Sequence, residues 1–260
     1  MAGTFDRFIA GSVRGRTYAR IVVKAVDIVA ARLLARKHLR RTLDAINFYS
    51  DLWTRGIKLY LPGEAASHTH WSLEFRTSSP PKFTCESTHA GPFPAYSVAD
   101  LQSHAAGFGW GRISQVLENK KRSDLEERIL SAVEWAGRAT VDDRKEESFL
   151  SFAIALEVLL LGRKVESELT HRLATRGAHL LMSDFTGRRN VQKDLRELYK
   201  TRSRIVHSGN LMVTEGELGR IRFLAKTALV IALTHERFLS MQSEKELDNW
   251  FEDEALKGSR

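Results

Sequence analysis

The chain has 260 residues, of which 43% are hydrophobic and 28% are charged, a composition typical of globular proteins with one or two domains and a buried core. Only 5 residues are proline, which argues against a long disordered segment. The formal net charge of +8 and the pI of about 9.7 favour a polyanionic partner such as nucleic acid, an acidic membrane or an acidic protein, although a solvated basic surface has the same composition.

The cysteine count and the apolar segments limit where the protein works. Cys85 is the single cysteine, so an internal disulfide is excluded and a reducing compartment fits. The longest apolar stretch, Phe149–Leu161, is shorter than the roughly 20 residues that span a bilayer. Met1–Arg20 contains arginines but no apolar core of a signal peptide. We therefore expect a cytoplasmic protein with no membrane association.

The first predicted elements are a strand and a long helix. Tyr18–Ala25 is rich in β-branched residues and predicts a strand. Asp27 can cap a following helix, because apolar residues then recur at three- and four-residue steps as far as Trp53.

Residues 56–105 differ in character, since all five prolines of the chain fall between Pro62 and Pro94. Ile57–Leu61 and Trp71–Phe75 predict short strands. The turns expected around them are Pro62-Gly63, Ser78-Ser79-Pro80-Pro81 and Gly91-Pro92. We therefore predict a small α+β N-terminal region over residues 1–108.

From Trp110 onward there is no proline and the apolar spacing is helical, which predicts a helical domain over residues 109–260 and a mostly α fold. Thr214 and Glu217 form a capping-box pattern. The helices expected are Arg112–Leu117, Leu125–Arg138, a helix capped by Asp142 or Asp143 and ending at Leu161 before Gly162, Glu166–Met182, Asn190–His207, Thr214–Leu239 and Ser243–Ala255.

Glu157 stands out inside the apolar helix FLSFAIALEVLLL. A helix that is apolar nearly all round belongs in a bundle centre, and a carboxylate there needs a cationic or hydrogen-bonding partner. The candidate partners on other helices are Arg172, Arg176 and Arg202. Alternatively, Glu157 lies on a thin solvated stripe.

The segment LYKTRSRIVHSGN combines apolar anchors with positive charge and ends near His207. The positive charges on this predicted helix are Lys193, Arg196, Lys200, Arg202 and Arg204. A histidine at a helix C-terminus is also a common cap, and an arginine-rich face is often only solvated. Five residues leave a net turn of roughly 140° on a helix. Arg202 and His207 therefore converge only if Arg202 curls back, if the helix end distorts, or if a second copy brings its own pair to a dimer interface.

LYKTRSRIVHSG resembles the Arg–(four to six residues)–His signature of the HEPN superfamily, in its Apea-like branch. FLSFAIALEVLLLG resembles the buried glutamate-bearing helix of that branch, and Glu168–Leu181 resembles the helix that follows it. The resemblance covers about residues 140–240. It implies an all-α, often dimeric domain, and many members are metal-independent endoribonucleases in toxin, phage-defence and RNA-processing systems.

The resemblance assigns roles residue by residue. Arg202 and His207 match the two motif residues, and Tyr199, Gly209 and Glu157 match accessory positions. Ser203 departs from the Asn, Asp or His that follows the motif arginine in many nuclease members. Arg172 is a further supporting candidate. No cofactor or metal is implied, and a cognate antitoxin or regulator is a possible partner alongside RNA.

The residue types also suit RNA cleavage independently of the resemblance. RNA carries its nucleophile in the 2′-hydroxyl, and a histidine such as His207 exchanges protons near neutral pH. Arg202 can bind a phosphate through two hydrogen bonds and stabilise developing charge, while Lys200, Arg204 and Arg196 can hold flanking phosphates. Cleavage then leaves a cyclic phosphate and a 5′-hydroxyl. The alternatives are a non-catalytic HEPN module that binds RNA or a nucleotide or stabilises a dimer, and a helical scaffold for an acidic partner.

The sequence gives weaker support for other candidate sites. His68 and His70 would share a face of a strand, as zinc ligands can, but no third ligand has fitting spacing, and a surface pair is the simpler interpretation. No P-loop sequence is present. The glycine-rich Gly107–Gly111 lacks a strand–helix context for a dinucleotide and favours a hinge.

Overall fold

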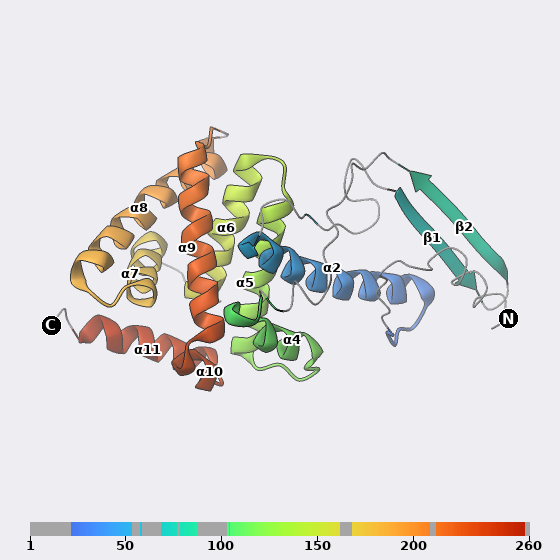
Figure 1. Ribbon diagram of the computed structural model, residues 1–260, viewed down its shortest axis with the longest axis horizontal. Coiled ribbons are helices and arrows are strands. Elements are labelled where there is room, and N and C mark those ends of the chain that lie inside the picture. The colour runs from blue at the N-terminus through green and yellow to red at the C-terminus, as the bar shows by residue number, and fades with distance from the viewer. Residues whose placement is uncertain are drawn as a thin grey trace. The chain divides into compact units, whose positions relative to one another are not determined.

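The computed structural model describes residues 22–53, 58, 69–76, 79–87, 103, 105–161, 168–208 and 212–257, and it is mostly helical (Figure 1). Chain contacts divide it into two units, Met1–Thr42 and Leu43–Arg260. The elements are α2 (Ile28–Trp53), β1 (Thr69–Arg76), β2 (Ser79–Ser87), η1 (Ala106–Phe108), α4 (Trp110–Glu118), α5 (Asp124–Val141), α6 (Lys145–Leu161), α7 (Leu169–Leu181), α8 (Phe185–Ser208), α9 (Glu215–Thr234), α10 (Glu236–Ser240) and α11 (Glu244–Leu256).

The α+β region predicted for residues 1–108 is not supported. The described residues Val22–Ala25, at the end of the expected strand, have no regular structure. The long helix is present as α2, but its C-terminal half belongs to the helical unit, where Ala45, Phe48 and Tyr49 are fully buried. Long-range packing of this kind leaves no local signal in the sequence.

Strand β1 contains the predicted strand Trp71–Phe75 and pairs antiparallel with β2, with Leu73 opposite Phe83. The turn expected at Ser78–Pro81 is wrong in position, because β2 begins at Ser79. Lys58, the one described residue of the expected strand Ile57–Leu61, is not in a strand. The other expectations that lie outside the described residues concern Pro62-Gly63, Gly91-Pro92, Gly162 and the side chain of Cys85.

Helix α2 crosses α5 at very short range. An added Cβ on Gly137 would lie 1.9 Å from the carbonyl oxygen of Asp44, so only glycine allows this approach. The fully buried Asp44 accepts a charge-assisted hydrogen bond of 3.2 Å from Arg138 Nε. Backbone contact and ion pair together fix the C-terminal half of α2 on α5.

Helix α6 is the centre of the helical unit. Phe149, Phe152, Leu156, Leu159 and Leu160 on this helix are all buried, and α6 packs against α5, α7, α8 and α9. The buried position predicted from its apolar sequence is therefore confirmed. Asp142 does not cap it, however: this residue ends α5, and α6 begins at Lys145.

The capping box predicted at Thr214 and Glu217 is present, with Thr214 accepting from the Glu217 amide and Glu217 accepting from the Thr214 amide. The helix that it starts ends earlier than predicted. His235 is extended, and its ring accepts from the Arg237 amide to begin α10. A side-chain cap thus divides the expected Thr214–Leu239 helix.

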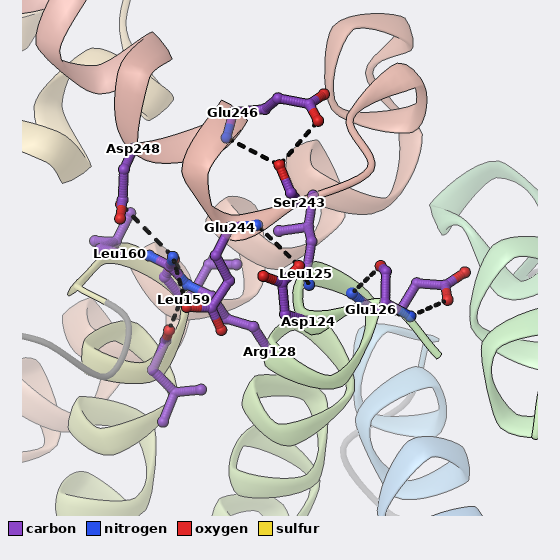
Figure 2. A network of polar contacts seen from close by, with 12 residues as sticks. Asp124, Leu125, Glu126, Arg128, Leu159, Leu160, Ser243, Glu244, Glu246 and Asp248 are labelled. Carbon is purple, nitrogen blue, oxygen red and sulfur yellow. Dashed lines mark hydrogen bonds and ion pairs between the residues drawn. The ribbon is translucent and has the colours of Figure 1, made fainter. Parts of the chain in front are cut away.

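Two arginines cap the C-terminal end of α6; Figure 2 labels one of them, Arg128, beside Leu159 and Leu160. Arg128 Nε, on α5, donates to the carbonyls of Val158 and Leu159 at 3.0 and 3.1 Å. Arg176, on α7, donates through Nη1 to the Leu160 carbonyl at 2.7 Å. These carbonyls have no partner within their own helix, and cations are favourable at this negative end of the helix dipole.

Helix α11 brings the opposite charges to the same place. Asp248 Oδ1 accepts from Arg176 Nη1 at 2.8 Å and lies 3.6 Å from Arg128 Nη1, with Glu244 3.9 Å from the same nitrogen. Burial lowers the pKa of Arg128, and the carboxylates of Asp248 and Glu244 oppose that shift. The Arg176 guanidinium also lies 5.0 Å from the ring centroid of Phe251. The pairing therefore docks α11 onto α5, α6 and α7.

None of the helices in the described part of the chain combines the length and hydropathy needed to cross a membrane.

The crossing of α2 and α5 predicts that Gly137→Ala is strongly destabilising. The methyl group would overlap the Asp44 backbone, so the free energy of unfolding should fall by more than about 3 kcal/mol. Gly219→Ala on α9 is the control, because an added Cβ there meets nothing within 4 Å and should stabilise the helix by about 0.5–1 kcal/mol. Urea unfolding measures both, and a Gly137→Ala variant as stable as the parent would contradict the described crossing.

The cap on α6 predicts that Arg176→Met lowers the free energy of unfolding by about 2–3 kcal/mol. Methionine keeps the packing but leaves the Leu160 carbonyl without its donor, whereas the partly exposed Asp248 regains water. Arg144→Met is the control, since Arg144 forms only exposed ion pairs with Glu146 and Glu147 and should change stability by less than about 0.5 kcal/mol. Equal losses in the two variants would show that the cap contributes nothing beyond a surface ion pair.

Candidate functional site

Helices α6 and α8 bring Glu157 and Arg202 together. Arg202 Nε lies 3.2 Å from Glu157 Oε1 as an ion pair, without hydrogen-bond alignment. Tyr199, one turn earlier on α8, donates its hydroxyl to the same oxygen at 3.0 Å and lies 3.3 Å from the Ala153 carbonyl. The cationic partner predicted for Glu157 is thus present, and among the three candidates it is Arg202.

The surroundings of Glu157 hold its carboxylate in place. Its side chain is 18% exposed, so it lies at the margin of the core and not at its centre. Burial, reinforced by the Glu157 carboxylate, raises the pKa of Tyr199 well above its ordinary value, so the phenol stays protonated and donates. Arg202 is held from one side by Glu157, with 28% of its side chain still exposed to solvent.

The other two candidate partners of Glu157 lie elsewhere. Arg176 binds the Leu160 carbonyl and Asp248. Arg172, which was expected to support the site, is half-buried on α7 and has no ion pair with any carboxylate that the structure describes.

His207 is exposed in the last turn of α8, which continues as a regular helix to Ser208. The helix end therefore does not distort between Arg202 and His207, and the angle of roughly 140° between them holds. Arg202 faces α6 while His207 faces solvent. One chain does not place the two side chains on a common helix face, and Gly209, the next matched position, lies outside the described residues.

The remaining candidates on α8 separate into paired and unpaired groups. Arg204 donates to Glu217 and Thr201 at 3.2 and 2.9 Å, which ties it to the start of α9. Hydrogen bonds from the Thr214 amide and from the Thr201 and Thr214 hydroxyls, together with Arg204, lower the pKa of Glu217. Arg204 therefore ties α8 to the start of α9, while half of its side chain remains exposed.

Lys200, Ser203 and Arg196 remain exposed on α8. Arg196 lies 3.3 Å from the ring of His171 on α7. Arg189 shares their exposed face but was not among the residues predicted from the sequence. Its regular spacing from Lys193 and Arg196 along the helix is the signal that identifies it.

The weaker candidates are not assembled into sites. Among the described residues, no group of three or more His, Cys, Asp or Glu could hold a metal ion; His68 and the side chain of His70 lie outside them. Gly109 has a φ of 86° and starts α4, where an added Cβ would lie 2.6 Å from Leu233 Cβ. Within the glycine-rich Gly107–Gly111, Gly109 thus packs closely against α9, whereas an added Cβ on Gly107 or Gly111 would meet nothing within 4 Å.

Comparisons with known proteins add no relative: no family model, no curated protein and no solved structure matches the chain.

The contact between Glu157 and Tyr199 predicts a coupled loss of stability. Tyr199→Phe should cost about 1 kcal/mol of unfolding free energy, and at least about 0.5 kcal/mol less when Glu157 is already alanine. Tyr49→Phe is the control, because the buried Tyr49 hydroxyl has no hydrogen-bond partner among the described residues, so its removal should be neutral or stabilising. Urea unfolding of the four members of the cycle tests this, and additive effects would mean that the two groups do not interact.

Proposed function

We propose that the chain is a metal-independent endoribonuclease of the HEPN type, with Arg202 and His207 as its catalytic pair. The observation that carries the proposal is the fixed position of Arg202. Glu157 and Tyr199 hold it at the margin of the core, and the HEPN-like sequence pattern assigns all three of these residues and His207 to one site.

The residues suit transesterification of RNA. A neutral His207 takes the proton from a 2′-hydroxyl, whose oxygen attacks the adjacent phosphorus. The guanidinium of Arg202 stabilises the charge that builds up on the phosphoryl oxygens. The bond from phosphorus to the 5′-oxygen breaks, and a protonated histidine supplies the proton that this oxygen needs. The products are a 2′,3′-cyclic phosphate and a 5′-hydroxyl.

The orientation of the pair favours a site completed by a second copy of the chain. Arg202 and His207 lie on different sides of α8, so a strand at His207 of one copy takes its guanidinium from Arg202 of the other. Two copies also supply two histidines, one as base and one as acid. Such a homodimer, acting in the cytoplasm as a toxin or phage-defence effector and restrained by a cognate antitoxin or regulator, is the biological setting that this chemistry fits.

The second candidate function is RNA binding without cleavage. The observation that favours it is again the separation of Arg202 from His207 within one chain, because a module that only binds does not need the two groups to meet. Ser203, exposed next to Arg202, takes the place of a more polar side chain in many HEPN nucleases and also fits this alternative.

The two functions predict different results with labelled single-stranded RNA in the presence of EDTA. A nuclease cleaves the RNA to products with cyclic phosphate ends, and His207→Ala and Arg202→Ala each lower the rate by at least about 100-fold. His38→Ala, which removes another exposed histidine, should cleave like the parent.

Intact RNA after incubation with a well-folded parent that binds it would favour the non-catalytic function. A His207→Ala variant as active as the parent would contradict the assigned catalytic pair. Light scattering on the same samples tests the expected dimer.

A further inference from the structure

The solvent-exposed face of α8 carries a regular row of polar side chains that ends at His207. Successive members are four, three, four, three and four residues apart, so all of them lie within about 40° of one line along the helix, over a length of about 27 Å. All are exposed. We call this row the α8 stripe; its members are Arg189, Lys193, Arg196, Lys200, Ser203 and His207.

The neighbouring helices leave the α8 stripe open. On one side α7 contacts α8 through the hydrogen bond from Gln192 to Thr175, and Arg196 lies beside His171. On the other side, the acidic residues Asp194 and Glu197 of α8 pair with Arg220 of α9. The carboxylates of α8 are therefore turned away from the stripe, which carries positive charge alone.

The pairing of charges separates the α8 stripe from an ordinary solvated face. On the same helix, Arg188, Arg202 and Arg204 each form an ion pair with a glutamate of another helix. Within the described part of the Leu43–Arg260 unit, a few cations have no carboxylate within 4 Å: Lys120, Lys121, Arg172, Arg189, Lys193, Arg196, Lys200 and Lys245. Half of these lie on the α8 stripe, and Arg172 follows His171 on the adjoining α7.

We infer that the α8 stripe binds the sugar–phosphate backbone of single-stranded RNA and guides it to His207. The choice of RNA rests on the proposed function; the polyanionic character of the ligand rests on the unpaired charges. Lysine and arginine in a row neutralise phosphates without reading bases, and the stripe contains no Phe, Tyr or Trp side chain for stacking. Binding is therefore independent of base sequence.

The spacing of the charges favours one extended strand over a duplex. Neighbouring members of the α8 stripe are about 5 Å apart along the helix axis, whereas phosphates of a stacked strand advance by about 3.4 Å. A single row also meets a single backbone. An unstacked strand can separate its phosphates to match the row, and its flexibility allows the 2′-hydroxyl at His207 to reach the attack geometry.

Binding of a 2′-O-methyl uridine oligonucleotide tests the inference without relying on cleavage, because this probe lacks the nucleophile. Fluorescence anisotropy at several salt concentrations gives the affinity and its salt dependence. For four phosphate contacts the logarithm of the binding constant falls with a slope of about 2.8 against the logarithm of salt concentration.

The test variant is Lys193→Gln/Lys200→Gln, which should lower the slope by about 1.4 and weaken binding about tenfold at low salt. The matched control is Lys120→Gln/Lys121→Gln, which removes two exposed, unpaired lysines outside the stripe and should bind within twofold of the parent. Thermal unfolding should be unchanged in both variants, since all four side chains are exposed.

Equal weakening in both double variants would overturn the inference, as would a parent that does not bind the probe. A duplex of the same length that binds as well as the single strand would overturn the choice of strand. The expected binding with unmodified RNA left intact supports the α8 stripe and rejects the nuclease. Cleavage whose KM is unaffected by Lys193→Gln/Lys200→Gln supports the nuclease and rejects the stripe.

Discussion

The need to satisfy the carbonyl groups at the end of a buried helix organises this structure. Helix α6 is apolar enough to occupy the centre of the bundle, but its final carbonyls then lose water and each costs about 1–3 kcal/mol without a donor. Arg128 and Arg176 supply those donors from α5 and α7. Because the two cations are buried in turn, they require Asp248 and Glu244 of α11. One requirement thus ties together α5, α6, α7 and α11 (Figures 1 and 2).

The same cap determines what the candidate site can do. Glu157 is in the turn of α6 that directly precedes the capped carbonyls, so its carboxylate has a fixed position from which to hold Tyr199 and Arg202. Glu217, ordered by its own capping box, holds Arg204 in a similar way. Two arginines of α8 are therefore committed to neighbouring helices, and the unpaired charge of that helix is confined to its outer face. The ion pairs that Glu157 and Glu217 form therefore determine which cations of α8 remain available to a ligand.

Local patterns in the sequence were sufficient for the features that arise within one helix. Apolar spacing located α5 to α9, the Thr214 and Glu217 pattern located a cap, and a carboxylate in an apolar run implied a cationic partner. Contacts between distant segments gave no such signal. No residue near Gly137 in the sequence indicates that the backbone of Asp44 packs against it. No residue near Arg128 indicates that its side chain forms an ion pair with α11. The break at His235 depends on a histidine cap that competes with an otherwise continuous helix. The spacing of residues along α8 was enough to predict the α8 stripe. The positions of the surrounding helices were needed to show which of its cations have no carboxylate partner.

The different positions of Arg202 and the α8 stripe on this helix bear on how the proposed catalytic pair would be completed. Under the proposed function, a strand bound along the α8 stripe would approach His207 on the solvent face. Arg202 of the same chain points toward α6 and is held there by an ion pair at the margin of the core. Turning Arg202 outward within one chain would leave Glu157 partly buried without its cation, which is costly. In the proposed dimer, a guanidinium supplied by another copy would avoid that loss, because each Arg202 would keep its contact with Glu157 while its exposed part met a strand carried by the neighbour. The geometry of the single chain therefore argues for a shared site as the economical route to cleavage.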